Sequence, residues 1–449
     1  MLTRPPSLHP LAWLLPAAAL AYLNALGAGF QFDDFNVIVD NPAVHSLAAW
    51  WAGMPGIRPL LKLSYTLNWL ADPGPAGFHA VNVGLHLVNV ALVWRLTGHL
   101  PVPAGWREDA RGRRARILAT LLFALHPIQT ESVTYVSGRS MTLMAAFGLA
   151  GLLAWLEAPA RARPRRWRLA AVALFAAAAL TKEVAVVVPL LLLPLRHGRG
   201  RYLAPVLAAL ALAGLYYLFG YQHVLADPPP RSLAANLLSE ANAVYYLLGQ
   251  LVRPWALNID PQLPELSAWS SRSALQVGGL AGVAAAAWLA RRRAPWLAMP
   301  VFWFFVLLLP MYSVVPRLDL ASERHLYLAG LGPFWLLGLA GAAMAAWPWR
   351  AGVAVLAMAG IAFGHVRNLD YQDEVALWQQ TTRMAPDNAR AWNNLGWACY
   401  LAGRTEAARA AYRRALALDP DDAFSRGNLE LLGPPPRAPG AAPTSAGTP

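Results

Sequence analysis

Two neighbouring carboxylates, Asp33 and Asp34, directly follow the first apolar stretch of the chain. Adjacent carboxylates raise one another's pKa or bind a cation, so this pair could act as a general base or as a metal ligand. A carboxylate at the exit of an apolar helix can equally cap the next helix in a solvated loop. The pair is therefore a candidate for catalysis, with helix capping as the structural alternative.

A second polar motif ends a very short apolar run and extends from His126 to Glu131, with Arg139 shortly after it. Glu131 could take part in catalysis, or it could form a buried ion pair with Arg139. Polar groups this close to predicted membrane segments are costly to bury and are usually functional.

Two more motifs place charges at breaks between apolar runs. Lys182 precedes Glu183 at the first break, where the lysine could reach the membrane surface beside a helix hairpin or could bind an anionic ligand. At the second break, Ser322 could cap a helix whose first turn contains Glu323. Arg324 is unfavourable near a helix N-terminus, which suggests that it has another partner.

Polar residues also recur along one apolar segment, at His79, Asn82, His86 and Asn89. A polar stripe on a crossing helix must face the interior of the bundle, so we expect hydrogen bonds between helices. The two histidines lack the i, i+4 spacing of a helical zinc site, and no metal is expected there.

These motifs lie in a strongly apolar chain of 449 residues, 57% hydrophobic and 14% charged. Soluble proteins carry about a quarter charged residues, so the composition indicates an all-α, polytopic membrane protein. The 37 basic residues exceed the 24 acidic ones. Because the arginines are bunched between apolar runs, they favour membrane orientation over nucleic-acid binding. The single cysteine, Cys399, excludes an internal disulfide.

The apolar runs predict about eleven crossings. They cover residues 10–26, 80–96, 117–125, 143–156, 169–180, 184–195, 203–219, 274–289, 295–309, 326–347 and 351–363. The loops rich in arginine are expected to be cytoplasmic, and they lie at 107–116, 161–168, 196–201, 291–293 and Arg350.

This orientation places the N-terminus inside and the four polar motifs on the opposite, non-cytoplasmic side. The stretch 237–251 is apolar enough to cross as well. A crossing there would put the cluster 291–293 outside, so we interpret this stretch as an interfacial or re-entrant helix.

The C-terminal part has the spacing of a tetratricopeptide repeat, with Trp392, Gly396 and Tyr412 at characteristic positions. Residues 389–422 form one full repeat, flanked by partial repeats. We therefore expect a transmembrane domain at 1–366, a repeat module at 367–432 and a disordered tail rich in Pro, Ala and Gly at 433–449.

Several common catalytic motifs are absent from the sequence. It contains no phosphate-cradling glycine loop, no Gly-x-Ser-x-Gly, no His-Glu-x-x-His and no paired cysteines. The sequence therefore predicts no required cofactor and no metal motif, although a divalent metal bound by carboxylates stays an alternative.

An ordered set of motifs resembles the transmembrane and tetratricopeptide-repeat O-mannosyltransferases, within the GT-C superfamily of glycosyltransferases. The matching stretches are FDDFNVIVDNPAV, RPLLKLSYTLNW, GFHAVNVGLHLVNV, LHPIQTESVTYVSGR, TKE and SERHLYLAGLG, followed by the repeat helices. The resemblance covers residues 30 to about 432. The chain departs from the family's animal members in its short repeat array, so it resembles a short bacterial-type member.

The resemblance implies a membrane enzyme that moves a sugar, expected to be mannose, from a polyprenyl-phosphate donor to a protein Ser/Thr or glycan hydroxyl. It implies catalytic carboxylates at Asp33, Asp34 and Glu131. The cations expected to bind the donor phosphate are Arg58, Arg139, Lys182 and Arg324, and the expected supporting residues are His126, Glu183, Glu323 and His79. Fixed cations suit a leaving phosphate, and a base suits a hydroxyl acceptor.

The implied partners are the lipid-linked donor, the bilayer and an acceptor that the repeat module could hold, with no nucleic acid. The implied location is a bacterial inner membrane, with the repeat module on the extracytoplasmic side. The alternative is a non-catalytic scaffold or a transporter. A transporter would place charges near mid-membrane on several spans, whereas the charged motifs here cluster at one predicted face.

Overall fold

The structure is a computed structural model that describes residues 9–54, 56–195, 214, 231–313, 316–317 and 319–433. Every regular element in these residues is helical, which confirms the all-α expectation for them. The predicted apolar run 203–219, the arginine cluster 196–201 and nearly all of the tail lie outside the described residues.

The chain divides into two compact units. The first comprises the residues up to Ile259 together with Leu263–Asp373, and the second comprises Asp260–Gln262 and the residues from Glu374 onward. The boundary predicted between residues 366 and 367 falls inside a continuous helix, α16 (Ala346–Leu369).

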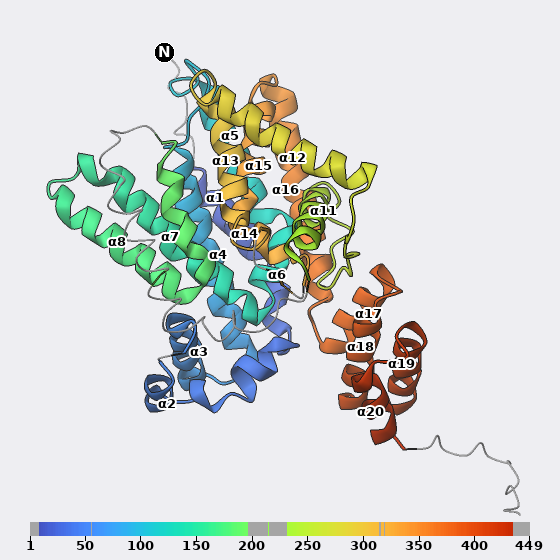
Figure 1. The fold of residues 1–449 in the computed structure, drawn as a ribbon. Coiled ribbons are helices and arrows are strands. Elements are labelled where there is room, and N and C mark those ends of the chain that lie inside the picture. The colour runs from blue at the N-terminus through green and yellow to red at the C-terminus, as the bar shows by residue number, and fades with distance from the viewer. Residues whose placement is uncertain are drawn as a thin grey trace, which may run out of the picture. The chain divides into compact units, whose positions relative to one another are not determined.

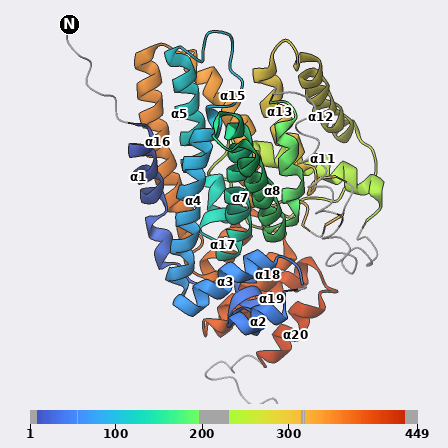
Figure 2. The same ribbon diagram turned by 90° about the vertical axis from the view of Figure 1, so that its left-hand side faces the viewer.

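The centre of the first unit is a bundle of long helices. α5 packs against α15, α4 packs against α7, and α1 lies along α4 and α16 (Figures 1 and 2). Large buried side chains such as Phe123, Trp303 and Trp335 fill its core. The bounds are α1 (Leu11–Ala21), α4 (Pro75–Thr97), α5 (Ala110–Leu125), α7 (Arg139–Glu157) and α15 (Leu331–Ala342).

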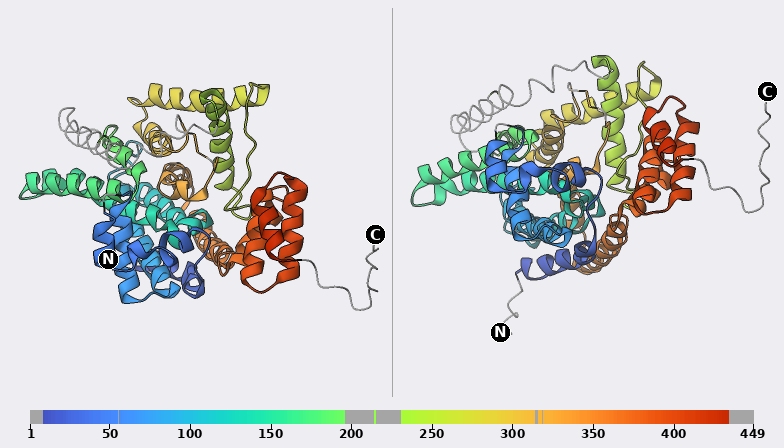
Figure 3. Two further views of the ribbon diagram at one scale, coloured as in Figure 1. Left: turned by 60° about the horizontal axis from the view of Figure 1, so that its bottom comes forward. Right: turned by 90° about the horizontal axis from the view of Figure 1, so that it is seen from below.

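A second group of helices continues this unit. α8 packs on α7, α13 packs on α15, and α11 packs against α12 (Figures 1 and 3). The bounds are α8 (Pro164–Thr181), the 3-10 helix η7 (Glu183–Leu192), α11 (Leu233–Gln250), α12 (Ser271–Ala290) and α13 (Pro295–Leu308).

By length and composition, four helices of the described chain could cross a membrane. They are α4, the helical stretch Val136–Ala160, α12 and α16. Glu323–Ala329 and Leu331–Ala342, which meet at a 56° bend, would form a fifth if they are one span. This is fewer than the eleven crossings expected, in part because the apolar helices Leu11–Gly27, Glu183–Leu192 and Pro295–Leu308 are shorter than a full span.

A short, fully buried segment lies where the long helices converge. It is formed by the one-turn elements η4 (Pro127–Gln129), α6 (Thr130–Val133) and η5 (Val136–Gly138), and it leads into α7. A Cβ atom on Gly138 would lie 2.3 Å from the carbonyl oxygen of Glu131, closer than any side chain permits. Glycine at this position therefore allows η5 to fold against α6 and sets the spacing between Glu131 and Arg139.

The polar stripe of α4 faces the bundle interior, as predicted. The amide of Asn82 donates to the carbonyls of Tyr135 and Val136, each at 3.2 Å. His86 hydrogen-bonds the Tyr327 hydroxyl at 2.9 Å, and Asn89 donates to the Thr142 carbonyl at 2.8 Å. These bonds fasten α4 to the buried segment and its neighbours.

The second unit contains a stack of helices at the red end of the chain in Figure 1, in which α17 packs on α18, α18 on α19 and α19 on α20. A Cβ on Gly396 would lie 2.5 Å from the Tyr412 ring, so glycine allows α18 and α19 to approach closely. The predicted repeat at 389–422 covers these two helices. The bounds are α17 (Glu374–Met384), α18 (Ala389–Leu401), α19 (Thr405–Leu418) and α20 (Ala423–Leu431).

The contact between α5 and α15 should tolerate no side chain at Gly338. A Cβ there would lie 2.6 Å from the Ala115 carbonyl oxygen, and backbone cannot move aside cheaply. We expect Gly338→Ala to lower the free energy of unfolding by about 1–3 kcal/mol. The measurement is the thermal midpoint of purified protein in detergent.

Gly352→Ala is the matched control, because Gly352 is also within a helix but has no atom within 4 Å of its Cβ position. It should leave the midpoint unchanged or raise it, since alanine is favoured over glycine in helices by about 1 kcal/mol. Equal midpoints for the two variants would contradict the packing described here.

Candidate functional site

The predicted carboxylate pair lies between α1 and the π-helix η2 (Phe35–Val39), and its two members differ in environment. Asp34 is fully buried. Its carboxylate accepts from the Ser137 backbone N–H at 2.8 Å, the Ser137 hydroxyl at 2.5 Å and the Gln31 N–H at 3.0 Å. Both oxygens are thereby occupied, so Asp34 fastens its loop to η5.

Asp33 is half-buried, and its backbone N–H donates to the Tyr135 hydroxyl at 3.0 Å. Its carboxylate interacts electrostatically with Arg324. Phe32, immediately before it, has a left-handed φ of 46°, which is unfavourable for a bulky side chain. Strain of this kind is often found beside functional groups. Asp33 is thus the member of the pair that a ligand can reach.

Glu131 is buried between α6 and the 3-10 helix η10 (Glu323–His325). Its carboxylate accepts from the Ser322 hydroxyl and the Arg324 backbone N–H, both at 2.8 Å, and lies 3.4 Å from Arg324 Nε. The alternative ion pair with Arg139 is therefore wrong, because Glu131 uses Arg324 as its cation. The alternative of Ser322 as a helix cap is also wrong, because its hydroxyl is bonded to Glu131 and caps no backbone N–H.

Arg139 is fully buried, and all its hydrogen-bond partners are neutral. Its guanidinium donates to the side-chain oxygens of Asn82 at 2.7 Å and Asn68 at 2.8 Å, and to the carbonyls of Phe78 and Ser64. These bonds use its donors to hold the start of α7 against α4 and α3 (Pro59–Ala71). The structure therefore gives Arg139 partners within the protein.

Lys182 lies in the break between α8 and η7, and 4% of its surface is exposed. Its ammonium donates to the Ser140 hydroxyl at 3.2 Å, and no carboxylate of the described residues forms an ion pair with it. Burial lowers the pKa of Lys182 well below its usual value, and the nearby Arg58 and Arg324 lower it further. The carboxylate of Glu183 acts on this ammonium from a distance and opposes the shift, but the two groups form no ion pair.

Glu183, next in the chain, turns to Arg58 instead. The two side chains form a bidentate pair with N–O distances of 2.8 and 3.0 Å. Arg58 adopts a left-handed φ of 55° at the start of α3, a conformation that L-residues adopt at a cost. Lys182 lowers the pKa of Glu183 further, but the two neighbours form no ion pair.

Two of the predicted supporting residues, Glu323 and His126, are hydrogen-bonded to neighbouring segments, whereas the ring nitrogens of the third, His79, have no hydrogen-bond partner among the described residues. Glu323 is buried and accepts from the Asn258 N–H and from Arg367 at 3.4 Å. His126 accepts from the Ile128 N–H, so its other ring nitrogen carries the proton and donates to the Leu251 carbonyl at 3.0 Å. His79 is buried beside the backbone of Gly29 and Thr134.

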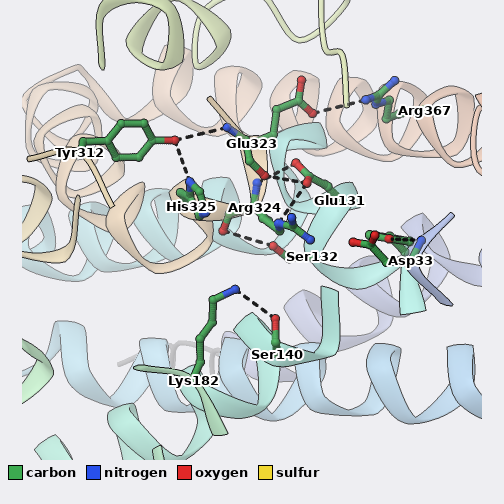
Figure 4. Close-up of polar contacts among 12 residues, drawn as sticks. Asp33, Glu131, Ser132, Ser140, Lys182, Tyr312, Glu323, Arg324, His325 and Arg367 are labelled. Atoms are coloured by element: carbon green, nitrogen blue, oxygen red, sulfur yellow. Dashed lines mark hydrogen bonds and ion pairs between the residues drawn. The ribbon is translucent and has the colours of Figure 1, made fainter. Parts of the chain in front are cut away.

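The structure thus brings Asp33, Glu131, Arg324 and Lys182 into one region, with Arg58 beside Lys182 (Figure 4). Sequence reasoning missed two residues there, Tyr312 and His325, whose side chains are bonded at 2.7 Å. The sequence places His325 directly after Arg324, and that adjacency is the signal that could have identified it. Among the described residues, no group of three or more His, Cys, Asp and Glu is arranged to hold a metal ion.

Burial raises the pKa of Asp34 to about 7, even though its hydrogen bonds to Ser137 and Gln31 oppose this shift. Between about pH 4 and 7 the folded protein keeps a proton that the unfolded chain releases. The free energy of unfolding should therefore fall with rising pH across this window, by up to about 4 kcal/mol, and stay constant above it.

The side chain in Asp34→Asn cannot titrate. The thermal midpoint of this variant should therefore lack the decrease with rising pH that Asp34 causes, whereas Asp33→Asn should keep that decrease. The measurement is the difference in midpoint between each variant and the original protein from pH 4.5 to 8. A constant difference for Asp34→Asn would contradict a buried, titrating Asp34.

The chain is similar to a repeat family model and to several proteins that are named protein O-mannosyl-transferase. A family model described as "Tetratricopeptide repeat" matches residues 364–423. Protein O-mannosyl-transferase Tmtc2 of Drosophila melanogaster is 38% identical over 192 residues, covering 38% of this chain and 19% of that protein. Protein O-mannosyl-transferase TMTC3 of Homo sapiens is 30% identical over 200 residues, covering 40% and 21%. Protein O-mannosyl-transferase Tmtc3 of Drosophila melanogaster is 25% identical over 506 residues, covering 90% and 54%.

No solved structure matches the chain. The aligned regions cover from about a fifth to about half of the length of these curated relatives. Each of these relatives is named a protein O-mannosyl-transferase. The match to the repeat model falls where the sequence pattern predicts the repeat. The chain is therefore similar in sequence to several protein O-mannosyl-transferases, which supports the resemblance that its motifs indicate.

Proposed function

We propose that the protein is a membrane glycosyltransferase that moves mannose from a polyprenyl-phosphate donor to a hydroxyl of a protein Ser/Thr or of a glycan. The observation that carries the proposal is one region containing both a reachable carboxylate, Asp33, and a buried ammonium, Lys182, that forms no ion pair among the described residues. The names of the relatives support the transferred group.

The carboxylate of Asp33 acts as the base in this proposal. It accepts the proton of the acceptor hydroxyl while that oxygen bonds to the anomeric carbon of the sugar. The bond from this carbon to the phosphate oxygen breaks, and the polyprenyl phosphate leaves with the electron pair. Atoms and charge balance without an oxidant or a cofactor.

Lys182, Arg58 and Arg324 stabilise the negative charge that develops on the leaving phosphate. Arg58 and Arg324 are held by Glu183 and Glu131, so their charges are fixed in place before the donor binds. A fixed donor of this kind contributes about 2–4 kcal/mol to stabilising the transition state. Asp34 and Arg139 act differently, by positioning the buried segments beside the reacting groups.

We propose the same membrane setting that the arginine clusters predict. The chain crosses about eleven times, with the N-terminus in the cytoplasm and the site at the extracytoplasmic face of a bacterial inner membrane. Residues 1–366 form the catalytic domain. The repeat module at 367–432 lies in the same extracytoplasmic compartment as the site and binds the acceptor.

The direct test incubates the purified full chain with polyprenyl-phosphate mannose and extracytoplasmic proteins, and then measures mannosylated products by mass spectrometry. The proposal expects hexose on Ser/Thr or on a glycan, together with released polyprenyl phosphate. Absence of product in every donor and acceptor combination, from protein with a normal unfolding midpoint, would count against it.

Replacing Asp33 by Asn should lower the rate of sugar transfer about 10²–10⁴-fold, because the amide cannot accept the hydroxyl proton. The KM for the donor should change little. Asp40→Asn is the matched control, since Asp40 is an exposed carboxylate of the same loop. Transfer by Asp33→Asn at the original rate would remove Asp33 from the role of base.

A further inference from the structure

His325 lies in a hydrogen-bond chain that determines which ring nitrogen carries a proton. The Ser322 backbone N–H donates to the Tyr312 hydroxyl oxygen at 3.3 Å, and this hydroxyl lies 2.7 Å from Nδ1 of His325. The Tyr312 proton has no other acceptor among the described residues, so it is donated to Nδ1. The neutral ring must then carry its own proton on Nε2.

The Nε2–H group has no partner within the described part of the chain. His325 is 9% exposed, and the charged groups that act on its ring are Lys182, Arg317 and Arg324. Figure 4 shows the ring and the Lys182 side chain approaching the same region from different elements. A donor beside three cations is suited to an anionic oxygen, and no oxygen of the described residues fills that role.

We propose that Nε2–H of His325 donates a hydrogen bond to a phosphate oxygen of the lipid-linked donor, and that Tyr312 is the positioning residue that fixes this tautomer. This inference rests on the proposed function and adds a neutral donor to its cations. A neutral donor binds the phosphate without adding a further positive charge to a region that already holds Lys182 and Arg324.

The first experiment measures affinity for two probes, polyprenyl phosphate and the matching polyprenol without phosphate, using the full chain in detergent. His325→Ala should lose about 10- to 100-fold in affinity for polyprenyl phosphate, the effect of one hydrogen bond to a charged group. Its affinity for polyprenol should be unchanged. His325→Gln should stay within about threefold of the original protein, because its amide can donate from a similar position.

Tyr312→Phe should lower the affinity for polyprenyl phosphate about 2- to 10-fold, because without the Tyr312 hydroxyl the His325 ring can adopt either tautomer. The second readout is ¹⁵N NMR of histidine-labelled protein, with the His325 signals identified by their loss in His325→Ala. We expect protonated Nε2 and unprotonated Nδ1 in the original protein, and a mixed signal in Tyr312→Phe.

The outcomes distinguish a failure of the proposed function from a failure of the role of His325 alone. If the original protein neither transfers mannose nor binds polyprenyl phosphate, the proposed function fails and this role fails with it. If it does both but His325→Ala keeps full affinity, this inference alone is overturned. It is also overturned if Ala and Gln variants lose equally for both probes with lowered unfolding midpoints, because that pattern indicates a structural role.

Discussion

The buried ammonium of Lys182 is the constraint on which the candidate site depends. A buried charge without an ion-pair partner is costly, and here Arg58 and Arg324 add charges of the same sign, which the more weakly acting Glu183 offsets only in part. The carboxylates that could neutralise it are used elsewhere, Glu183 by Arg58 and Glu131 by Arg324. A phosphate-bearing donor would give the Lys182 ammonium a direct ion-pair partner, which is why the proposed function fits this site.

The short buried segment before α7 supports this arrangement mechanically. It holds Asp34 through Ser137, presents Glu131 to Arg324, and begins α7 with Arg139 bonded to neutral oxygens. Gly138 makes the tight fold of this segment sterically feasible. The charged groups of the candidate site are thus held on buried turns, so they need little rearrangement when a ligand binds.

Sequence alone predicted the helical class, the repeat helices and the inward polar stripe, because these follow from periodicity and from the cost of burying polar groups in lipid. It could not predict the pairing of charges. Glu183 adjoins Lys182 in sequence but bonds Arg58, and Glu131 pairs with Arg324 rather than Arg139. Such choices are made by helix packing between distant segments. The sequence likewise does not distinguish Asp33 from Asp34, whereas the structure shows that Asp34 is fully buried and Asp33 is not.

The proposed binding of the donor phosphate by Lys182 is tested most directly by native mass spectrometry of the protein with polyprenyl phosphate. Lys182→Met should weaken binding at least tenfold, whereas Lys62→Met, which removes the other lysine of the chain, should bind as the original protein does. Equal binding by the original protein and both variants would contradict the account, since the buried ammonium would then have no role in holding the phosphate.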